Sequence, residues 1–362
     1  MSKFMRRALE LALRGAGGAD PNPLVGAVIV RDGKIIGEGF HEYFGGPHAE
    51  VNAFSSLKES AEGAEMYVTL EPCSHYGKTP PCAEAVVKNK IKKVYIGMTD
   101  PNPKVAGRGM QILKNAGIDV ETGILETECR SINAPFIKHI TTGLPYIVLK
   151  WAMSLDGKIA CRTGESKWIS CEQSRAEVQA LRNRYMGIMA GINTVLADDP
   201  LLTCRIEGGR APYRIICDSN LKIPENAKVL GNDGKCIIAT VSENSEKIKR
   251  LEDKGVKIIS TPQKNGKVDL NYLMKELGAV GINGILCEGG GTLNFALLES
   301  GIADKVITYT APVLIGGSNA KTPVEGMGFA HITDCVRLEN IKTRLCGSDV
   351  VTEAEVIKCL PE

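Results

Sequence analysis

One imidazole, two thiols and a separate carboxylate occur at spacings that suit a catalytic metal site. His48 and Glu50 lie two residues apart, and Cys73 and Cys82 follow later, each directly after a proline. Three protein ligands leave the fourth tetrahedral position of zinc for water, and the ion lowers the pKa of that water from about 15.7 toward about 7. Glu50 shares a helical turn with His48 but points elsewhere, so it can approach the water without binding the ion. The pattern predicts zinc held by His48, Cys73 and Cys82, with Glu50 as the general base and acid.

The prolines support this interpretation. Proline is favoured in the first turn of a helix, so Pro47 and Pro81 place His48 and Cys82 near helix N-termini. The positive end of the helix dipole then helps to hold Cys82 as a thiolate. A structural zinc clip is the alternative, but such sites normally use four protein ligands, and only His41 and His75 are spare donors nearby. A clip would also leave Glu50 without a purpose.

Zinc beside one free carboxylate suits hydrolytic deamination of an amino-substituted heterocycle. His48-Ala49-Glu50 followed by Pro72-Cys73 resembles the zinc-dependent nucleobase deaminase family. Between Cys73 and Cys82 this chain has the eight residues Ser74 to Pro81, where the general family has two. The longer segment resembles the deaminase domain of riboflavin-pathway enzymes, in which it helps to bind a phosphorylated substrate. The resemblance implies substrate contacts for six residues: Asn22, His41, His75, Lys78, Asp100 and Asn102.

Three of these residues, which lie in two polar segments, also stand out by their place in the chain. Asn22 precedes the first expected strand, and Asp100-Pro101-Asn102-Pro103 follows a strand that ends at Met98. Ligands of open α/β sheets bind at the carboxyl ends of the strands, where such a segment would lie. A plain turn, which needs no function, is the alternative for Asp100 to Pro103.

A second constellation lies in the other half of the chain. Gly284 to Cys287 reads as a buried strand that leads into Glu288 and the run Gly289 to Gly291, and a helix follows through Ser300. Backbone N–H groups of such a run can approach a phosphate, and the helix dipole favours its charge. A tight turn is the alternative. The run is not G-x-G-x-x-G, which disfavours a Rossmann domain.

Four segments of this half, 149–160, 164–170, 194–203 and 288–294, together resemble the riboflavin-pathway reductase domain. That domain has a fold similar to dihydrofolate reductase. The family often has Thr where this chain has Ser170, although the hydroxyl is kept. The order of the two halves resembles the bifunctional bacterial family of riboflavin biosynthesis. The resemblance implies zinc-assisted removal of the pyrimidine 2-amino group, then NADPH reduction of the ribosyl group to a ribityl chain.

The same resemblance implies roles for individual residues of the second half. Substrate orientation and proton transfer would fall to Lys150, Asp198 and Glu288. The substrate phosphate would be bound by Ser166, Arg182 and Arg205, although a solvated helix face is the alternative for each arginine. The residues expected along NADPH are Ala152, Trp168, Ser170, Thr194, Asp198, Ser219, Gly289, Gly290, Gly291 and Thr292.

Strands and helices alternate in both halves, which predicts two α/β domains. The first should be a three-layer domain like cytidine deaminase, over residues 1–143, and the second a domain like dihydrofolate reductase, over residues 146–362. The expected elements of the first are a helix near 1–15, a hairpin about 31–34, strands at 66–70 and 94–98, and helices at 48–57, 82–89 and 108–115. Those of the second are strands near 146–151, 187–191, 213–217, 236–240, 256–259, 284–288 and 305–310, and helices near 172–185, 243–253, 269–277 and 292–300.

Composition limits the remaining classes of function. The 362 residues carry 44 Lys and Arg against 42 Asp and Glu, a formal charge of +2, and neither half has the basic excess of a nucleic-acid binder. That balance and the few aromatic residues disfavour a nucleic-acid editing deaminase. A non-catalytic zinc module joined to a nucleotide-binding sensor domain is the remaining alternative. The 12 cysteines without a secretory signal, and apolar runs too short for a membrane span, predict a cytoplasmic protein. We expect phosphorylated pyrimidine substrates and a homo-oligomer.

Overall fold

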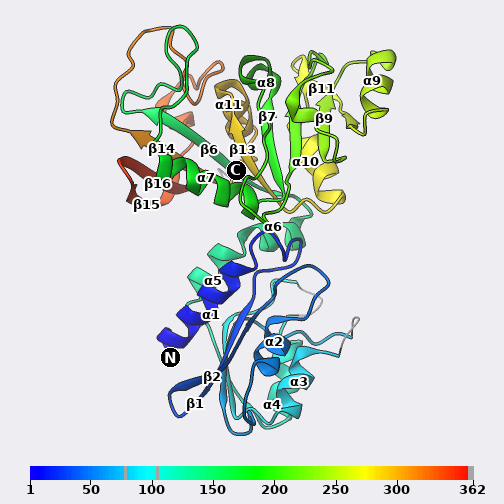
Figure 1. Ribbon diagram of the computed structural model, residues 1–362, viewed down its shortest axis with the longest axis vertical. Coiled ribbons are helices and arrows are strands. Elements are labelled where there is room, and N and C mark those ends of the chain that lie inside the picture. The colour runs from blue at the N-terminus through cyan, green and yellow to red at the C-terminus, as the bar shows by residue number, and fades with distance from the viewer. Residues whose placement is uncertain (77–79, 103–105, 358–362) are drawn as a thin grey trace. The chain divides into compact units, whose positions relative to one another are not determined.

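The structure is a computed structural model that describes residues 1–76, 80–102 and 106–357 (Figure 1). The chain divides into two compact units, Met1–Gly143 and Leu144–Glu362. Each unit is built on one main β-sheet with helices around it, so the predicted α/β class is confirmed. Within the described residues, no helix combines the length and the apolar character needed to cross a membrane.

The first unit is a five-stranded sheet in the order β2-β1-β3-β4-β5. The β1–β2 and β1–β3 pairs are antiparallel, and the β3–β4 and β4–β5 pairs are parallel. Its elements are α1 (Ser2–Arg14), β1 (Gly26–Arg31), β2 (Lys34–Phe40), α2 (Ala49–Ser55), β3 (Glu65–Leu70), α3 (Cys82–Lys88), β4 (Lys93–Met98), α4 (Arg108–Asn115), β5 (Asp119–Thr122), α5 (Glu126–Ile132) and α6 (Ala134–Thr142).

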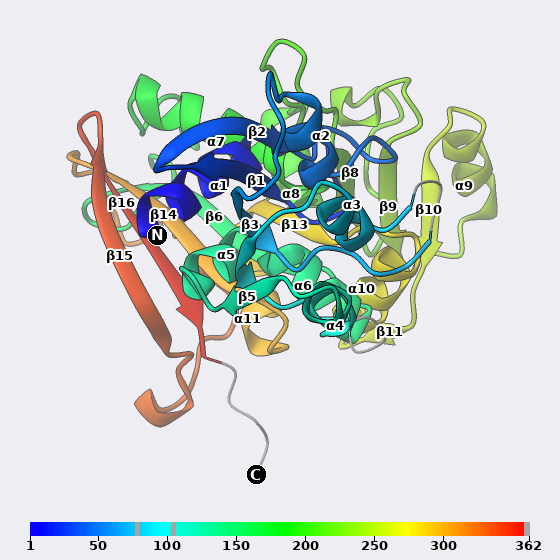
Figure 2. The ribbon, with the colours of Figure 1, turned by 90° about the horizontal axis from the view of Figure 1, so that it is seen from below.

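Helices cover both faces of this sheet. One core joins the apolar stripe of α1, including Met5 and Ala8, to Val28, Tyr67 and α5. The other core joins α2, α3 and α4 to the alternate residues of the same strands, such as Ile29. Figure 2 shows α1 and α5 on one side of the strands and α2, α3 and α4 on the other. Because side chains alternate between the two faces of each strand, the sheet packs against one helical layer on each face. This is the three-layer arrangement that the sequence predicted.

The second unit is a nine-stranded sheet in the order β10-β9-β8-β7-β13-β6-β14-β16-β15. The strands from β10 to β14 are parallel, and β16 and β15 continue the sheet antiparallel. The elements are β6 (Tyr146–Ser154), α7 (Glu172–Arg184), β7 (Gly187–Gly191), α8 (Ile192–Asp198), β8 (Tyr213–Cys217), β9 (Cys236–Thr240), α9 (Ser245–Glu252), β10 (Lys257–Ser260), β11 (Gln263–Lys264), β12 (Lys267–Val268), α10 (Leu270–Ala279), β13 (Gly284–Gly289), α11 (Gly291–Glu299), β14 (Lys305–Ala311), β15 (Leu338–Cys346) and β16 (Asp349–Val356), with short 3-10 turns at Lys228–Leu230 and Ile332–Asp334.

The central strands of this sheet are buried on both faces. Ile147, Leu149, Ile285 and Cys287 belong to one core, and Val148 and Leu286 belong to another on the opposite side. Such continuous apolar runs are typical of parallel strands covered by helices on both sides. Because the strands are parallel, their carboxyl ends meet at one edge, where the loops after β6, β7, β8 and β13 come together.

Candidate active sites

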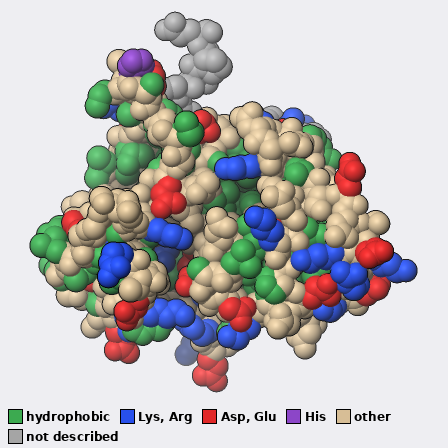
Figure 3. Space-filling model, turned by 90° about the horizontal axis from the view of Figure 1, so that it is seen from above, with side chains coloured by type: hydrophobic (Ala, Val, Ile, Leu, Met, Phe, Trp, Pro, Cys, Tyr) green, Lys and Arg blue, Asp and Glu red, His purple; other side chains and the backbone are tan. Residues whose placement is uncertain are grey.

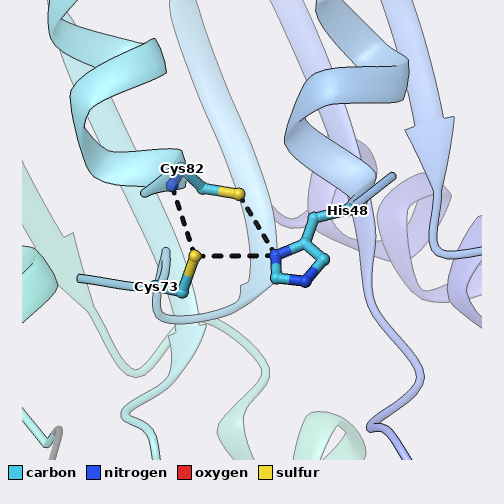
Figure 4. Close-up of side chains that lie close together, drawn as sticks. All are labelled: His48, Cys73 and Cys82. Carbon is cyan, nitrogen blue, oxygen red and sulfur yellow. Dashed lines mark hydrogen bonds between the residues drawn. The ribbon is translucent and has the colours of Figure 1, made fainter. Parts of the chain in front are cut away.

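The structure brings the three predicted metal ligands of the first unit together. His48 immediately precedes α2, Cys82 is the first residue of α3, and Cys73 lies in the loop after β3. The Nδ1 atom of His48 lies 3.5 Å from the Cys73 Sγ and 3.3 Å from the Cys82 Sγ, and all three ligand atoms lie within 4.8 Å of one another (Figure 4). Tetrahedral zinc, with bonds of about 2.0 Å to nitrogen and 2.3 Å to sulfur, separates such atoms by about 3.5 Å. The donor set therefore fits zinc in both type and spacing.

A negative charge on one of the two sulfur atoms disfavours a negative charge on the other. The backbone N–H of Cys82 donates to the Cys73 Sγ at 3.2 Å. The Cys82 side chain and the His48 ring lower the pKa of Cys73, which favours its thiolate form. The interaction with Cys73 and burial raise the pKa of Cys82. A cation between the sulfur atoms would stabilise both as thiolates, which is the usual state of a metal-bound cysteine.

Glu50 is buried beside this cluster, with 3% of its surface exposed. Burial, and then the charge of Cys73, raise the pKa of Glu50 to about 7. A carboxyl group with a pKa near neutrality can both accept and return a proton, which is what general acid–base catalysis needs. Glu50 is the second residue of α2, so one short helix positions both Glu50 and, at its N-cap, His48.

Asn22 and His41 form a polar pair next to the metal ligands. The Nδ1 of His41 lies 2.9 Å from the Pro47 carbonyl oxygen, which can only accept, so Nδ1 carries the proton. The Nε2 of His41 is then the acceptor for the Asn22 side-chain amide at 3.0 Å. Burial lowers the pKa of His41, which keeps its ring neutral. The His41 and His48 rings meet edge to face, with 5.5 Å between their centroids.

Of the remaining residues predicted for the deaminase substrate, His75 lies in the loop after β3, and Asp100 and Asn102 lie in the loop after β4. Asp100 accepts a hydrogen bond from the Asn102 backbone N–H at 2.8 Å. Burial raises the pKa of Asp100, and the hydrogen bond from the Asn102 N–H opposes that shift. Lys78 lies outside the described residues.

Two positioning contacts of this unit were missed by the sequence analysis. The buried Asn133 accepts from the Leu24 N–H at 2.8 Å and donates to the Leu24 carbonyl at 3.0 Å, which anchors the segment after Asn22. The buried carboxylate of Glu71 accepts hydrogen bonds from the loop after β4 and from the first turn of α4. Both contacts join residues far apart in sequence. The only feature of the sequence that could have indicated a role for Glu71 is its position two residues before Cys73.

A cavity of about 580 Å³ lies at the carboxyl ends of β6, β7, β8 and β13 in the second unit. Figure 3 looks onto this end, where lysine and arginine side chains surround a hollowed surface. Eleven of the predicted residues line the cavity: Lys150, Ala152, Ser166, Thr194, Asp198, Ser219, Glu288, Gly289, Gly290, Gly291 and Thr292.

Charged side chains meet at one wall of the cavity. Lys150 Nζ lies 3.7 Å from the Glu288 Oε2. Burial would raise the pKa of Glu288, but the charges of Lys150 and Arg182 outweigh it and lower that pKa to about 2. Burial, supported by the charge of Arg182, lowers the pKa of Lys150. The wall thus presents an ionised carboxylate and an amine that gives up its proton more readily than an exposed lysine.

The glycine run after β13 lies against this cavity. Gly290 has φ 79°, a left-handed conformation that favours glycine, and it is the N-cap of α11. A Cβ on Gly291 would lie 2.6 Å from both the Glu325 Cγ and the Thr322 carbonyl oxygen. The helix N-terminus can therefore present bare backbone N–H groups to the cavity, as an anion site requires.

Four predicted residues lie away from the cavity wall. Arg182 contacts Glu288 with its guanidinium and donates to the Thr203 carbonyl at 3.0 Å. Trp168 is exposed and stacks with the Arg175 guanidinium, 4.7 Å from the ring centroid. The others are Ser170, whose carbonyl accepts from Arg175, and the exposed Arg205.

Comparison with known families and proteins agrees with this division into two sites. Residues 1–98 match the cytidine and deoxycytidylate deaminase zinc-binding region, and residues 145–352 match the RibD C-terminal domain. The riboflavin biosynthesis protein RibD of Actinobacillus pleuropneumoniae is 47% identical over 359 residues, which cover 99% of this chain and 96% of that protein. The chain belongs to the RibD family.

Other RibD proteins match over nearly the whole chain. Escherichia coli RibD is 42% identical over 96% of this chain and 97% of its own length. The solved structure of Acinetobacter baumannii RibD has a TM-score of 0.88 at 41% identity, and covers 98% of each chain. A Thermotoga maritima structure, described as a diaminohydroxyphosphoribosylaminopyrimidine deaminase and 5-amino-6-(5-phosphoribosylamino)uracil reductase, has a TM-score of 0.86 at 36% identity, with 98% of each chain covered. As a RibD protein, the chain is a deaminase and a reductase of riboflavin biosynthesis.

Proposed function

We propose that each unit catalyses one of two consecutive reactions. The first unit deaminates 2,5-diamino-6-(5-phosphoribosylamino)pyrimidin-4(3H)-one by hydrolysis. The second reduces the ribosyl group of 5-amino-6-(5-phosphoribosylamino)uracil to a ribityl chain with NADPH. The observation that carries the proposal is the buried Glu50 beside the His48, Cys73 and Cys82 ligand set. The same chain has a cavity lined by the glycine-rich N-terminus of α11, which can bind an anion. The description of the T. maritima relative supports both substrates.

In the deaminase site, His48, Cys73 and Cys82 would hold zinc, which would supply a water of lowered pKa. Glu50 moves the protons of the hydrolysis: its carboxylate takes one from the attacking water and returns one to the amino group that leaves as ammonia, so water and the amine give a carbonyl and ammonia. The pKa of Glu50, about 7, suits both transfers. The Asn22–His41 pair and Asp100 with Asn102 orient the pyrimidine, and His75 and Lys78 bind its phosphorylated arm.

In the reductase site, bound NADPH would supply the hydride for C1′ of the opened sugar. Lys150 holds a proton at Nζ for the sugar oxygen that ring opening releases, and its lowered pKa eases that transfer. The ionised Glu288 keeps Lys150 in place, and Asp198 lines the same cavity. These three residues therefore orient the sugar and manage its protons.

Binding of the two phosphorylated ligands is assigned to the rest of the second unit. The Gly289 to Thr292 segment would bind the pyrophosphate of NADPH at the N-terminus of α11, and Ala152 of β6, Thr194 of α8 and Ser219 of the loop after β8 would line the cofactor. Trp168 and Ser170 cover the cofactor from the loop after β6. Ser166, Arg182 and Arg205 bind the substrate phosphate, for which Arg182 must exchange part of its contact with Glu288.

The assembly and the compartment form a further part of the proposal. The edge strand β15 presents Leu338, Ile341 and Leu345 to solvent. An exposed edge strand with apolar side chains is a template for pairing with a second copy, so we assign the homo-oligomer interface to β15. A change of Leu345 to Lys should lower the mass of the particle in solution if β15 forms the interface.

The metal site needs Cys73 and Cys82 as free thiols, which favours the reducing cytoplasm.

Zinc removal tests the division of labour between the units. A chelator should abolish ammonia release from the diaminopyrimidine, while NADPH oxidation with the deaminated substrate continues, and added zinc should restore ammonia release. The Lys150→Ala variant should do the opposite, with slower NADPH oxidation and unchanged ammonia release. Ammonia release that survives zinc removal, or the absence of NADPH oxidation with the deaminated substrate, would contradict the proposal.

A further inference from the structure

Glu71 is a buried carboxylate whose hydrogen-bond partners among the described residues are backbone N–H groups. It is 5% exposed and lies directly after β3, two residues before Cys73. Its Oε2 accepts from the N–H of Asp100 at 3.2 Å and of Gly107 at 3.0 Å. Its Oε1 accepts from the N–H of Met110 at 3.2 Å. A buried carboxylate is stable only when hydrogen bonds replace its water, and these three bonds do so.

The contacts place Glu71 at the start of α4. The N-cap of α4 is Gly107, which has no side chain to accept the free N–H groups of the first turn. The Glu71 carboxylate takes over that role from the loop after β3, and the helix dipole favours its charge. One side chain thus joins the loop of the metal ligand Cys73 to the start of α4.

A second observation, which does not involve the Glu71 carboxylate, also shows that α4 packs closely against the loop after β3. A Cβ on Gly109 would lie 2.0 Å from the carbonyl oxygen of Pro72. The first turn of α4 therefore packs directly on the backbone next to Cys73. Because β3 and β4 are adjacent parallel strands, with Leu70 opposite Met98, the loops after them leave the sheet at the same edge.

We propose that Glu71 is a positioning residue of the deaminase, which holds the loop of Asp100 and Asn102 in fixed register with Cys73. The inference rests on the proposed function, in which Asp100 and Asn102 orient the pyrimidine. Glu71 acts through the backbone and does not touch the ligand. Its loss lets the substrate loop move relative to the metal ligands, which weakens substrate binding more than it slows the proton transfers.

The Glu71→Gln variant tests this role. The amide keeps one oxygen acceptor but turns an NH₂ group toward backbone donors and removes the charge. We expect the amide protons of Asp100, Gly107 and Met110 to exchange at least ten times faster, and the KM for the diaminopyrimidine to rise at least tenfold. Zinc should stay at one per chain, and NADPH oxidation should not change. The matched control is Glu65→Gln, at the other end of β3, where the carboxylate bonds only to the Tyr67 hydroxyl in the described structure; it should leave exchange and KM unchanged.

Gly109→Ala provides an independent route if Glu71→Gln does not fold. Its new methyl group must push α4 from the Pro72 carbonyl, so it should raise KM with zinc retained. Unchanged exchange and KM in Glu71→Gln, or zinc loss in parallel with activity, would overturn the proposal. Faster exchange with an unchanged KM in both Glu71→Gln and Asp100→Asn would instead refute the substrate role of the loop, while leaving Glu71 as its anchor.

Discussion

The guanidinium of Arg182 contacts both carboxylate oxygens of Glu288, with Nε 2.5 Å from Oε1 and Nη2 2.9 Å from Oε2. The pair is largely buried, and its Glu288 lines the reductase cavity, where Lys150 approaches the same carboxylate. A buried carboxylate between two cations remains ionised, because each cation favours the charged form. The electrostatics of this wall therefore depend on all three residues together.

Replacement of Arg182 by Ala should destabilise the second unit. It leaves a buried ionised carboxylate whose remaining cationic partner among the described residues is Lys150, and loss of one member of a buried pair typically costs about 3–5 kcal/mol. Denaturant unfolding measures the change, and NADPH oxidation should fall while ammonia release persists. Arg250→Ala is the matched control, because its pair with Glu225 lies at the surface and is worth about 0–1 kcal/mol. Equal stability of the two variants would contradict the importance of the buried pair.

The stability of the second unit should depend on Glu288 in acid. The pKa of Glu288 is about 2 in the folded protein, below its ordinary value of 4.5. Between these values the unfolded chain binds a proton that the folded chain does not, so this contribution to stability is present above pH 4.5 and is lost as the pH falls toward 2. Unfolding free energies measured from pH 5 to pH 3 should fall more steeply for the natural chain than for Glu288→Gln. Parallel slopes would show that Glu288 is not held ionised.

Gly291→Ala should weaken NADPH binding at least tenfold. Its Cβ would collide with the Thr322 carbonyl and displace the start of α11, where we place the pyrophosphate. Gly191→Ala is the control, because Gly191 lines the same cavity but its Cβ would meet only ordinary contacts at 3.7 and 3.8 Å. Titration of cofactor fluorescence gives both affinities. If Gly291→Ala binds NADPH as tightly as the unchanged protein does, the cofactor does not bind at the start of α11.

The sequence predicted most of the fold because the central strands and the amphipathic helices have strong local patterns. The continuous apolar run at 284–288 and the Asp32-Gly33 turn are examples, and both elements form where expected. The hairpin of β15 and β16 was not predicted. Residues 338–345 are all exposed at the sheet edge, so β15 has no alternation of buried and exposed positions to reveal it.

The candidate sites were predictable to the extent that their residues lie in local motifs. His48 and Glu50 share one turn, and the glycine run directly follows its strand. The positioning contacts were not predictable in this way. Glu71 meets backbone groups 29 to 39 residues away, and Arg182 meets Glu288 across 106 residues. Only the packing of strands and helices brings such groups together.

The Glu50→Gln variant gives the most direct test of the deaminase assignment, because glutamine fills the same buried space but cannot carry the proton. Ammonia release from the diaminopyrimidine should fall at least ~100-fold, the lower end of what a general acid–base group contributes. Zinc content should remain at one per chain, and NADPH oxidation in the same sample should keep its rate. Ammonia release at the natural rate in zinc-loaded Glu50→Gln would contradict the account.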